Sequence, residues 1–149
     1  MAIRNLTPYN DPRFDKTSRE ITQYNPRLFN LLDDMRDTLS KARGYGCAAV
    51  HMGVLRRVVL ILEETGTLEL INPTITRVST QTQRVLEGSI APGAPQGYVM
   101  RPLTVTVAAY NRQGQAITIT GEGFLAATLC HEIDHINGIR YSDKFLRLP

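Results

Sequence analysis

Hydrophobic residues near the start of the chain recur with the period of an α-helix. Between residues 26 and 42 they are Leu28, Leu31, Leu32, Met35 and Leu39, a spacing that places them on one helix face. Asn25 and Pro26 stand at the head of this run, and asparagine at the N-cap with proline at the first helical position is a common helix start. The pattern predicts a helix at about residues 26–42, preceded by a polar, irregular segment over residues 1–24.

Apolar runs in the middle of the chain predict β-strands. Residues 58–62 are all apolar and mostly β-branched, which indicates a buried strand. Residues 68–72 predict a second strand that ends at Pro73, since proline cannot donate a ladder hydrogen bond. Loose alternation then extends strand character over residues 74–86.

Turn-forming residues divide the stretch that follows. Residues 88–97 contain three glycines and two prolines, which predicts a loop. Apolar and polar positions alternate over residues 103–109 and again at 117–119. The polar residues 111–114 between these runs predict a turn, so the two runs are expected to form a β-hairpin.

The last helical pattern is the most apolar part of the chain. It begins at Glu122, and its apolar positions are Leu125, Ala126, Ala127, Leu129, Cys130, Ile133 and Ile136. A helix with so little polar surface is normally buried. Asn137 and Gly138 are expected to end it, and residues 139–145 are expected to add an edge strand. Helix, several strands and a buried helix together predict an α+β fold.

Length, charge and cysteine content narrow the class of protein. The chain has 149 residues, which predicts one domain over residues 1–149. The net charge of +3 is spread along the chain and has no basic block, so no specific nucleic-acid site is indicated; transient attraction to acidic ribosomal RNA stays open. Cys47 and Cys130 lack the spacing of a disulfide framework, and neither a signal peptide nor a membrane span is apparent, so a cytoplasmic protein is expected.

The buried helix carries the segment His131-Glu132-Ile133-Asp134-His135. Histidines four residues apart share one helix face, so His131 and His135 can occupy two corners of a tetrahedral metal site. Glu132 between them can move a proton for an attacking water. The same pattern can arise by chance on an exposed helix. Burying these polar side chains without partners would be costly, however, which favours a metal site.

The third histidine of the chain, His51, closes the segment Gly44-Tyr45-Gly46-Cys47-Ala48-Ala49-Val50-His51. The segment lacks the lysine of a phosphate-binding loop, so nucleotide binding is rejected. Its glycines can let the backbone approach a ligand closely. His51 itself is either part of a ligand site or an ordinary surface or half-buried histidine.

Three segments together resemble the peptide deformylase family. They are Gly44-Tyr45-Gly46-Cys47-Ala48-Ala49-Val50-His51, similar to G-x-G-x-A-A-x-Q, Glu87-Gly88-Ser89-Ile90-Ala91, similar to E-G-C-L-S, and His131-Glu132-Ile133-Asp134-His135, which matches H-E-x-D-H. The resemblance covers nearly the whole chain with the same order and spacing. It implies antiparallel sheets packed around the central motif helix, and removal of the formyl group from N-formylmethionyl peptides.

The resemblance also implies roles for residues of this chain. His131 and His135 would bind a divalent metal ion, Fe(II) in most of the family, and Glu132 would be the general acid/base. The backbone N–H of Ile90 would stabilise the oxyanion.

Further positions are implied to line or support the site. Tyr45, Gly46 and the loop after Gly88 would line the substrate cleft. Arg101 is expected to pair with Glu87 behind the site.

Two positions depart from the family pattern. Ser89 stands where the family has its cysteine ligand, and a hydroxyl is a poor substitute for a thiolate. His51 stands where the family has glutamine; a neutral imidazole can still donate a hydrogen bond to an oxyanion, or can bind metal.

Several accounts of the third ligand stay open. His51 can replace the cysteine in a three-histidine site, which would favour Zn(II). The site can instead have lost its metal, a water can fill the position, or Ser89 can be an engineered replacement. Cys47 and Cys130 are candidate replacement thiolates, but Cys47 is expected to pack as a small apolar residue and Cys130 to point away from the motif.

Three functions therefore compete. The first is a metal-dependent deformylase acting on N-formyl peptides. The second is an impaired homologue that binds a peptide N-terminus or a partner without turnover. The third is a metallopeptidase of the HExxH type.

Overall fold

The computed structural model describes residues 2–147. Its α-helices are α1 (Pro26–Ala42) and α2 (Phe124–Ile136). Its strands are β1 (Gly46–Ala48), β2 (Val58–Glu63), β3 (Gly66–Val78), β4 (Thr82–Glu87), β5 (Gly97–Pro102), β6 (Thr104–Tyr110) and β7 (Ala116–Glu122). Its short 3₁₀ helices are η1 (Pro12–Asp15), η2 (Ala49–Met52) and η3 (Tyr141–Lys144).

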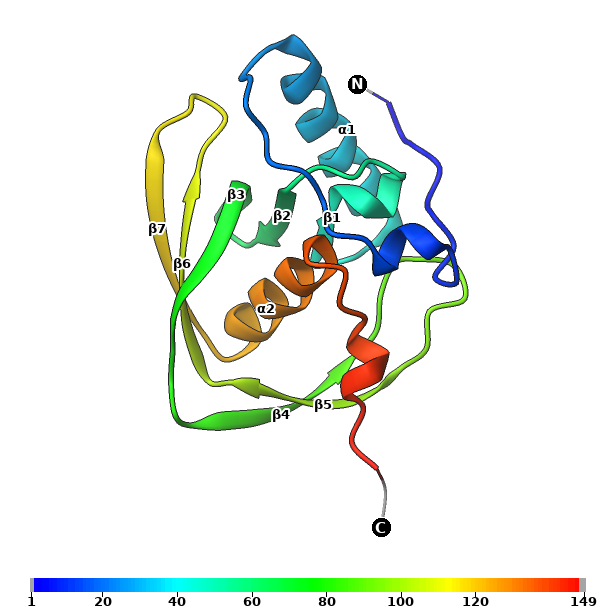
Figure 1. The fold of residues 1–149 in the computed structure, drawn as a ribbon, viewed down its shortest axis with the longest axis vertical. Coiled ribbons are helices and arrows are strands. Elements are labelled where there is room, and N and C mark those ends of the chain that lie inside the picture. The colour runs from blue at the N-terminus through cyan, green and yellow to red at the C-terminus, as the bar shows by residue number, and fades with distance from the viewer. Residues whose placement is uncertain (1, 148–149) are drawn as a thin grey trace.

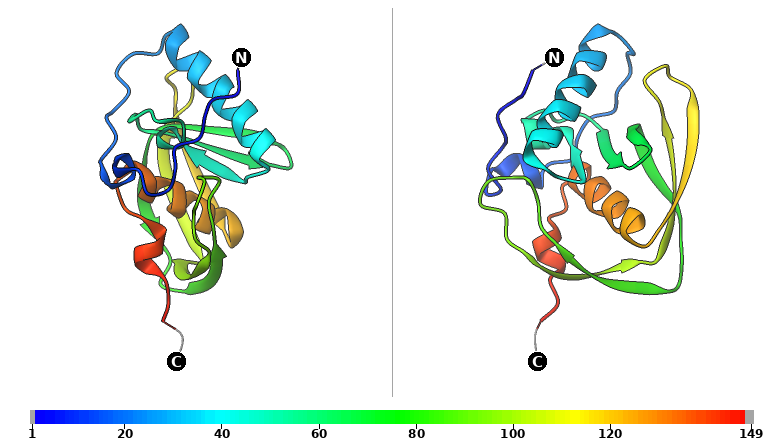
Figure 2. Two further views of the ribbon diagram at one scale, coloured as in Figure 1. Left: turned by 90° about the vertical axis from the view of Figure 1, so that its right-hand side faces the viewer. Right: turned by 180° about the vertical axis from the view of Figure 1, so that it is seen from behind.

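Two antiparallel sheets surround helix α2. The larger has the strand order β1-β2-β3-β6-β7, and the smaller pairs β4 with β5. Figure 1 shows α2 at the centre, with α1 beyond β1 and β2 and the β4–β5 pair on the other side. The same arrangement is visible from behind in Figure 2. The predicted α+β fold around a central motif helix is confirmed.

The larger sheet is buried on both faces at β2. Val59 and Ile61 belong to the apolar cluster that contains Leu129, Ile133 and Ile136 of α2. Val58 and Leu60 belong to the second cluster, formed with Leu32, Met35 and Leu39 of α1. Because side chains alternate across a strand, only a continuously apolar segment can fill both clusters. This accounts for the unbroken apolar run at residues 58–62.

The first helix is confirmed with the expected bounds. The Asn25 side chain accepts a hydrogen bond from the Leu28 N–H at 3.2 Å, as an N-cap does. Arg43 ends the helix in the left-handed conformation, with φ +57°. Neither α1 nor α2, nor any other helix of the described residues, is long and apolar enough to cross a membrane.

The predicted end of a strand at Pro73 is wrong. Strand β3 runs on to Val78, and its pairing with β6 shifts register between Ile71 and Thr74. Asn72 lies at this irregularity with φ +52°, and its side chain bonds the backbone N–H and carbonyl of Ile21 at 2.8 and 2.9 Å. A bulge leaves residues outside the ladder, so proline is tolerated there.

One further prediction needs correction, and one strand was not predicted. The strand-like stretch at residues 74–86 is the end of β3 and most of β4, separated near residue 80. The predicted loop at residues 88–97 ends where strand β5 begins, at Gly97, and no strand was predicted for residues 97–102.

The expected edge strand at residues 139–145 is absent. These residues instead contain η3, closed by the local bond from the Phe145 N–H to the Ser142 carbonyl at 3.2 Å. Tyr141 is buried, and burying this ring against the core favours a compact turn over an extended edge.

Candidate active site

Helix α2 brings the three motif side chains to one buried face. His131, Glu132 and His135 are each less than a tenth exposed. The Nε2 atoms of His131 and His135 lie 3.2 Å apart, and His131 Nε2 lies 4.0 Å from Glu132 Oε2. Two imidazole lone pairs and a carboxylate therefore converge, as the four-residue spacing of the histidines predicts.

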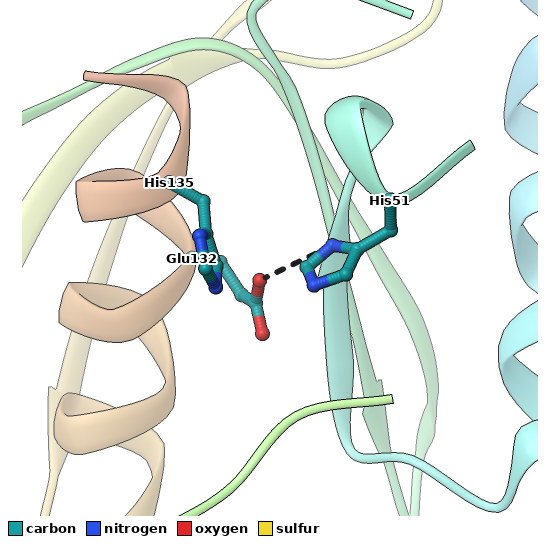
Figure 3. A group of neighbouring side chains, drawn as sticks. All are labelled: His51, Glu132 and His135. Atoms are coloured by element: carbon teal, nitrogen blue, oxygen red, sulfur yellow. Dashed lines mark ion pairs between the residues drawn. The ribbon is translucent and has the colours of Figure 1, made fainter. Parts of the chain in front are cut away.

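His51 reaches the same point from the opposite side. It lies on η2, and Figure 3 shows its ring pointing toward Glu132 and His135 on α2. His51 Nδ1 is 4.0 Å from Glu132 Oε1, and the centroids of the His51 and His135 rings are 4.8 Å apart. Strand β1 can approach α2 because it begins with Gly46, where a Cβ would lie 2.9 Å from the Thr128 methyl group.

Ser89 is hydrogen-bonded to His51. The Ser89 Oγ lies 3.1 Å from His51 Nε2 and accepts a hydrogen bond from the Ala91 N–H, also at 3.1 Å. The two positions that depart from the resemblance thus lie side by side. Their side chains form one polar pair beside the motif.

A buried charge network supports the motif from behind. Glu87 accepts two hydrogen bonds from Arg101, at 2.7 and 2.8 Å, and a third from His131 Nδ1 at 2.7 Å. Arg101 also donates to Asp134 at 2.7 Å, and Lys144 lies 2.9 Å from the same carboxylate oxygen. The expected Arg101–Glu87 pair is confirmed. Donation from Nδ1 to Glu87 leaves the His131 Nε2 lone pair directed at His135.

Aromatic rings hold the histidines in place. The ring of Phe14 packs against His51 and His135, with centroid distances of 5.4 and 5.3 Å. The ring of Tyr141 packs against His131 at 4.7 Å, and its hydroxyl donates to the Pro95 carbonyl. These contacts restrict the imidazoles to few orientations.

A cleft of about 370 Å³ opens beside His131 and Glu132. Tyr45, Gly46 and Gly88, expected to line a substrate cleft, all line it. Other lining residues include Ser89, Ile90, Leu86 and Phe124. The exposed rings of Tyr45 and Phe124 contact each other edge to face, with centroids 4.9 Å apart. The cleft thus combines an apolar wall with the polar groups of the motif, as ligand pockets commonly do.

Burial sets the protonation of the cluster. It raises the pKa of Glu132 to about 7 and lowers the pKa of His51 to about 3. It also holds the pKa of His135 well below its usual value. Burial opposes protonation of His131 too, but the carboxylates of Glu132 and Glu87 outweigh it and raise the His131 pKa. His51 and His135 are therefore neutral at neutral pH.

The described geometry agrees with comparisons to known proteins. The model of the polypeptide deformylase family matches residues 3–148. The chain belongs to the peptide deformylase family. The peptide deformylase of Alkaliphilus metalliredigens is 42% identical over 147 residues, covering 99% of both chains. That of Acetivibrio thermocellus is 42% identical over 99% of this chain and 86% of its own length.

Solved structures give the same result for the fold. The crystal structure of a peptide deformylase from Legionella pneumophila is 34% identical, with a TM-score of 0.92 over 97% of this chain and 87% of that one. The structure from Thermotoga maritima, 24% identical, has the same fold with a TM-score of 0.94 over 99% and 100%. Peptide deformylases are hydrolases that remove the N-formyl group from new peptide chains, and they use a divalent metal ion, typically Fe(II).

The residues present in this deformylase fit such an ion. Two nitrogen ligands of a tetrahedral ion, each at about 2.0–2.1 Å, lie roughly 3.3 Å apart, close to the 3.2 Å between the Nε2 atoms of His131 and His135. The His131–Glu87 bond is the carboxylate–histidine contact typical of metal ligands. His51, Glu132 and His135 form a buried group whose potential ligand atoms lie within 4.8 Å of one another. Glu132 Oε1 and His135 Nδ1 are buried without a hydrogen-bond partner among the described residues.

Several supporting residues carried no signal in the sequence. Phe14 and Tyr141 lie far from the motif along the chain, and only the fold places them on the histidines. Asp134 is inside the motif, yet its bonds to Arg101 and Lys144 could not be inferred from spacing. Cys47 is fully buried in the α1 cluster and Cys130 in the α2 cluster, as expected of small packing residues.

Because the network is buried, two arginine substitutions are expected to differ greatly in their effect on the free energy of unfolding. Arg101→Met would leave Glu87 buried without its main counter-charge, so we expect a loss of about 3–5 kcal/mol in the free energy of unfolding. Arg112→Met breaks the more exposed pairs with Glu69 and Asp33 and should cost less than about 1 kcal/mol. Denaturant unfolding measures both. Equal losses would contradict the role assigned to the buried pair.

Proposed function

We propose that this chain is a metal-dependent hydrolase that removes the formyl group from N-formylmethionyl peptides. The observation that carries the proposal is the 3.2 Å approach of the His131 and His135 Nε2 atoms beside a cleft that Glu132 also lines. A divalent ion bound there supplies a Lewis acid for the formyl carbonyl and makes the attacking water more acidic.

Glu132 is the proposed general acid/base. Its carboxylate borders the cleft and lies 4.0 Å from His131 Nε2. One carboxylate oxygen has no hydrogen-bond partner among the described residues, so it is free to take a proton from water. The same group can then deliver the proton to the amine that leaves as formate forms.

The cleft is the proposed site of the peptide N-terminus. Tyr45, Gly46 and Gly88 line it and would contact the first residues of the substrate. Ile90, which also lines it, offers a backbone N–H for the oxyanion that develops on the formyl carbonyl.

Formate release tests the function directly. Protein purified without oxygen and loaded with Fe(II) should release formate from formyl-Met-Ala, and removal of the ion by a chelator should abolish release until metal is restored. The stripped and reloaded samples control for each other. Metal-loaded protein that binds the peptide without releasing formate would favour the impaired homologue, and cleavage of unformylated peptides would favour a metallopeptidase.

Glu132→Gln tests the proton-transfer role. The amide cannot accept the water's proton, so we expect kcat to fall by about 10²–10⁴ with metal content unchanged. Glu122→Gln, on an exposed residue at the end of β7, is the matched control and should retain activity. A Glu132→Gln protein that loses its metal, or that retains full activity, would contradict the assignment.

We also infer that the chain works in the cytoplasm and meets new peptides at the ribosome. The net charge of +3 and two buried free cysteines support this. Contact with ribosomes should be weak and salt-sensitive, which co-sedimentation at low and high salt would measure. Absence of the protein from the ribosome pellet at low salt would contradict the contact.

A further inference from the structure

We propose that His51 is the third protein ligand of the metal ion, so that this deformylase has a three-histidine site. The proposal rests on the metal-dependent function above and concerns the position at which Ser89 replaces the cysteine of the family motif. It assigns to His51 a role for which the glutamine of that motif is poorly suited, because an amide offers a metal only its neutral carbonyl oxygen, a weaker ligand than imidazole for Zn(II) or Fe(II).

Two of the three pairs of imidazole rings already have the spacing of ligands on one ion. Rings that share a tetrahedral metal have centroids roughly 5 Å apart, given metal–nitrogen distances of about 2.0–2.1 Å. The His131–His135 and His51–His135 centroid distances are both 4.8 Å, with interplanar angles of 74° and 81°. The ring of His135 thus lies at the same distance from His51 as from His131, its neighbour on α2.

The second nitrogen of His51 has the partner that a metal ligand needs. A ligating histidine normally donates its other ring N–H to a carboxylate or a backbone carbonyl. His51 Nδ1 lies 3.1 Å from the Ala48 carbonyl, as His131 Nδ1 lies 2.7 Å from Glu87. Donation to Ala48 leaves the Nε2 lone pair of His51 for the metal. The Ala48 N–H also lies 3.0 Å from His51 Nδ1, and it would be accepted there by the other tautomer.

Ser89 is the weaker candidate for the same position. A serine hydroxyl must lose a proton to match a thiolate, and its neutral oxygen is a poor ligand beside imidazoles. The Ser89 Oγ also accepts the Ala91 N–H, which occupies one of its lone pairs. Ser89 lies 3.1 Å from His51 Nε2, so under this proposal it borders the ion as a hydroxyl neighbour.

The surroundings hold His51 rigidly, as a ligand requires. The side chain is 1% exposed, and Phe14 packs on both His51 and His135. The resulting site has three neutral nitrogen donors and leaves further positions of the ion to water or substrate. That donor set is typical of hydrolytic zinc sites.

The first experiment counts the histidine ligands in the unaltered protein. Each bound imidazole of Co(II)-loaded protein keeps one ring N–H, which gives a strongly shifted, exchangeable proton signal in the NMR spectrum. Three such signals are expected, because the chain has three histidines and the proposal makes each of them a ligand. Two signals would overturn the proposal. The absorption spectrum should lack a sulfur-to-cobalt charge-transfer band, and Ser89→Cys is the positive control expected to create one.

Variants give an independent test by metal affinity. His51→Gln restores the residue type of the family motif and keeps a polar side chain of similar size, but it removes the proposed ligand. We expect its Zn(II) affinity to fall at least about a hundredfold, more than the loss of a supporting residue causes. Ser89→Ala should change the affinity less than about threefold, whereas His131→Ala should abolish binding. Unchanged Zn(II) affinity in His51→Gln would overturn the proposal, and so would loss of metal in Ser89→Ala.

Failure of this inference can be told apart from failure of the proposed function. Metal-dependent formate release with two shifted N–H signals would leave the function intact and remove His51 from the ligand set. Three signals without formate release would keep the three-histidine site and reject the deformylase activity.

Discussion

The carboxylate of Glu87, buried between the smaller sheet and helix α2, is the charge on which the site depends. It is neutralised by two hydrogen bonds from Arg101 and accepts a third from His131. Arg101 extends the network to Asp134, one turn from His131 on α2. A buried charge without partners is costly, so strands β4 and β5 must pack where these bonds can form. The same bonds fix the tautomer of His131 and direct its Nε2 toward His135.

This constraint explains how the most apolar helix of the chain can carry a polar motif. The apolar residues of α2 fill the core with β2, β3 and β6, while its polar residues face Glu87, Arg101 and the cleft. Gly46 lets β1 approach α2 closely. The approach of β1 brings η2, and therefore His51, to the motif from the other side. The close packing of the larger sheet on α2 therefore also places His51 beside the motif.

The departures from the family motifs are coupled in space. Ser89 follows β4 and His51 lies on η2, separated by 38 positions in the sequence, yet their side chains are in hydrogen-bond contact. A single change at position 89 would remove a ligand from the site. A histidine at position 51 places a nitrogen donor within reach of the same cluster, so the pair preserves the number of strong donors.

Four features could be predicted from the sequence: the first helix, the buried strand β2, the hairpin of β6 and β7, and the motif helix with its two converging histidines. These features depend on local spacing, capping and periodicity, which a sequence displays directly. It did not determine the course of β3 past Pro73 or the turn at Tyr141, because a bulge tied to Ile21 and the burial of a ring against the core are long-range contacts. Motif resemblance predicted that His51 and Ser89 belong to the site. Their mutual contact, and the packing of Phe14 and Tyr141 on the imidazoles, became apparent only in the folded structure. Side chains distant in the chain meet only after the sheets close around α2.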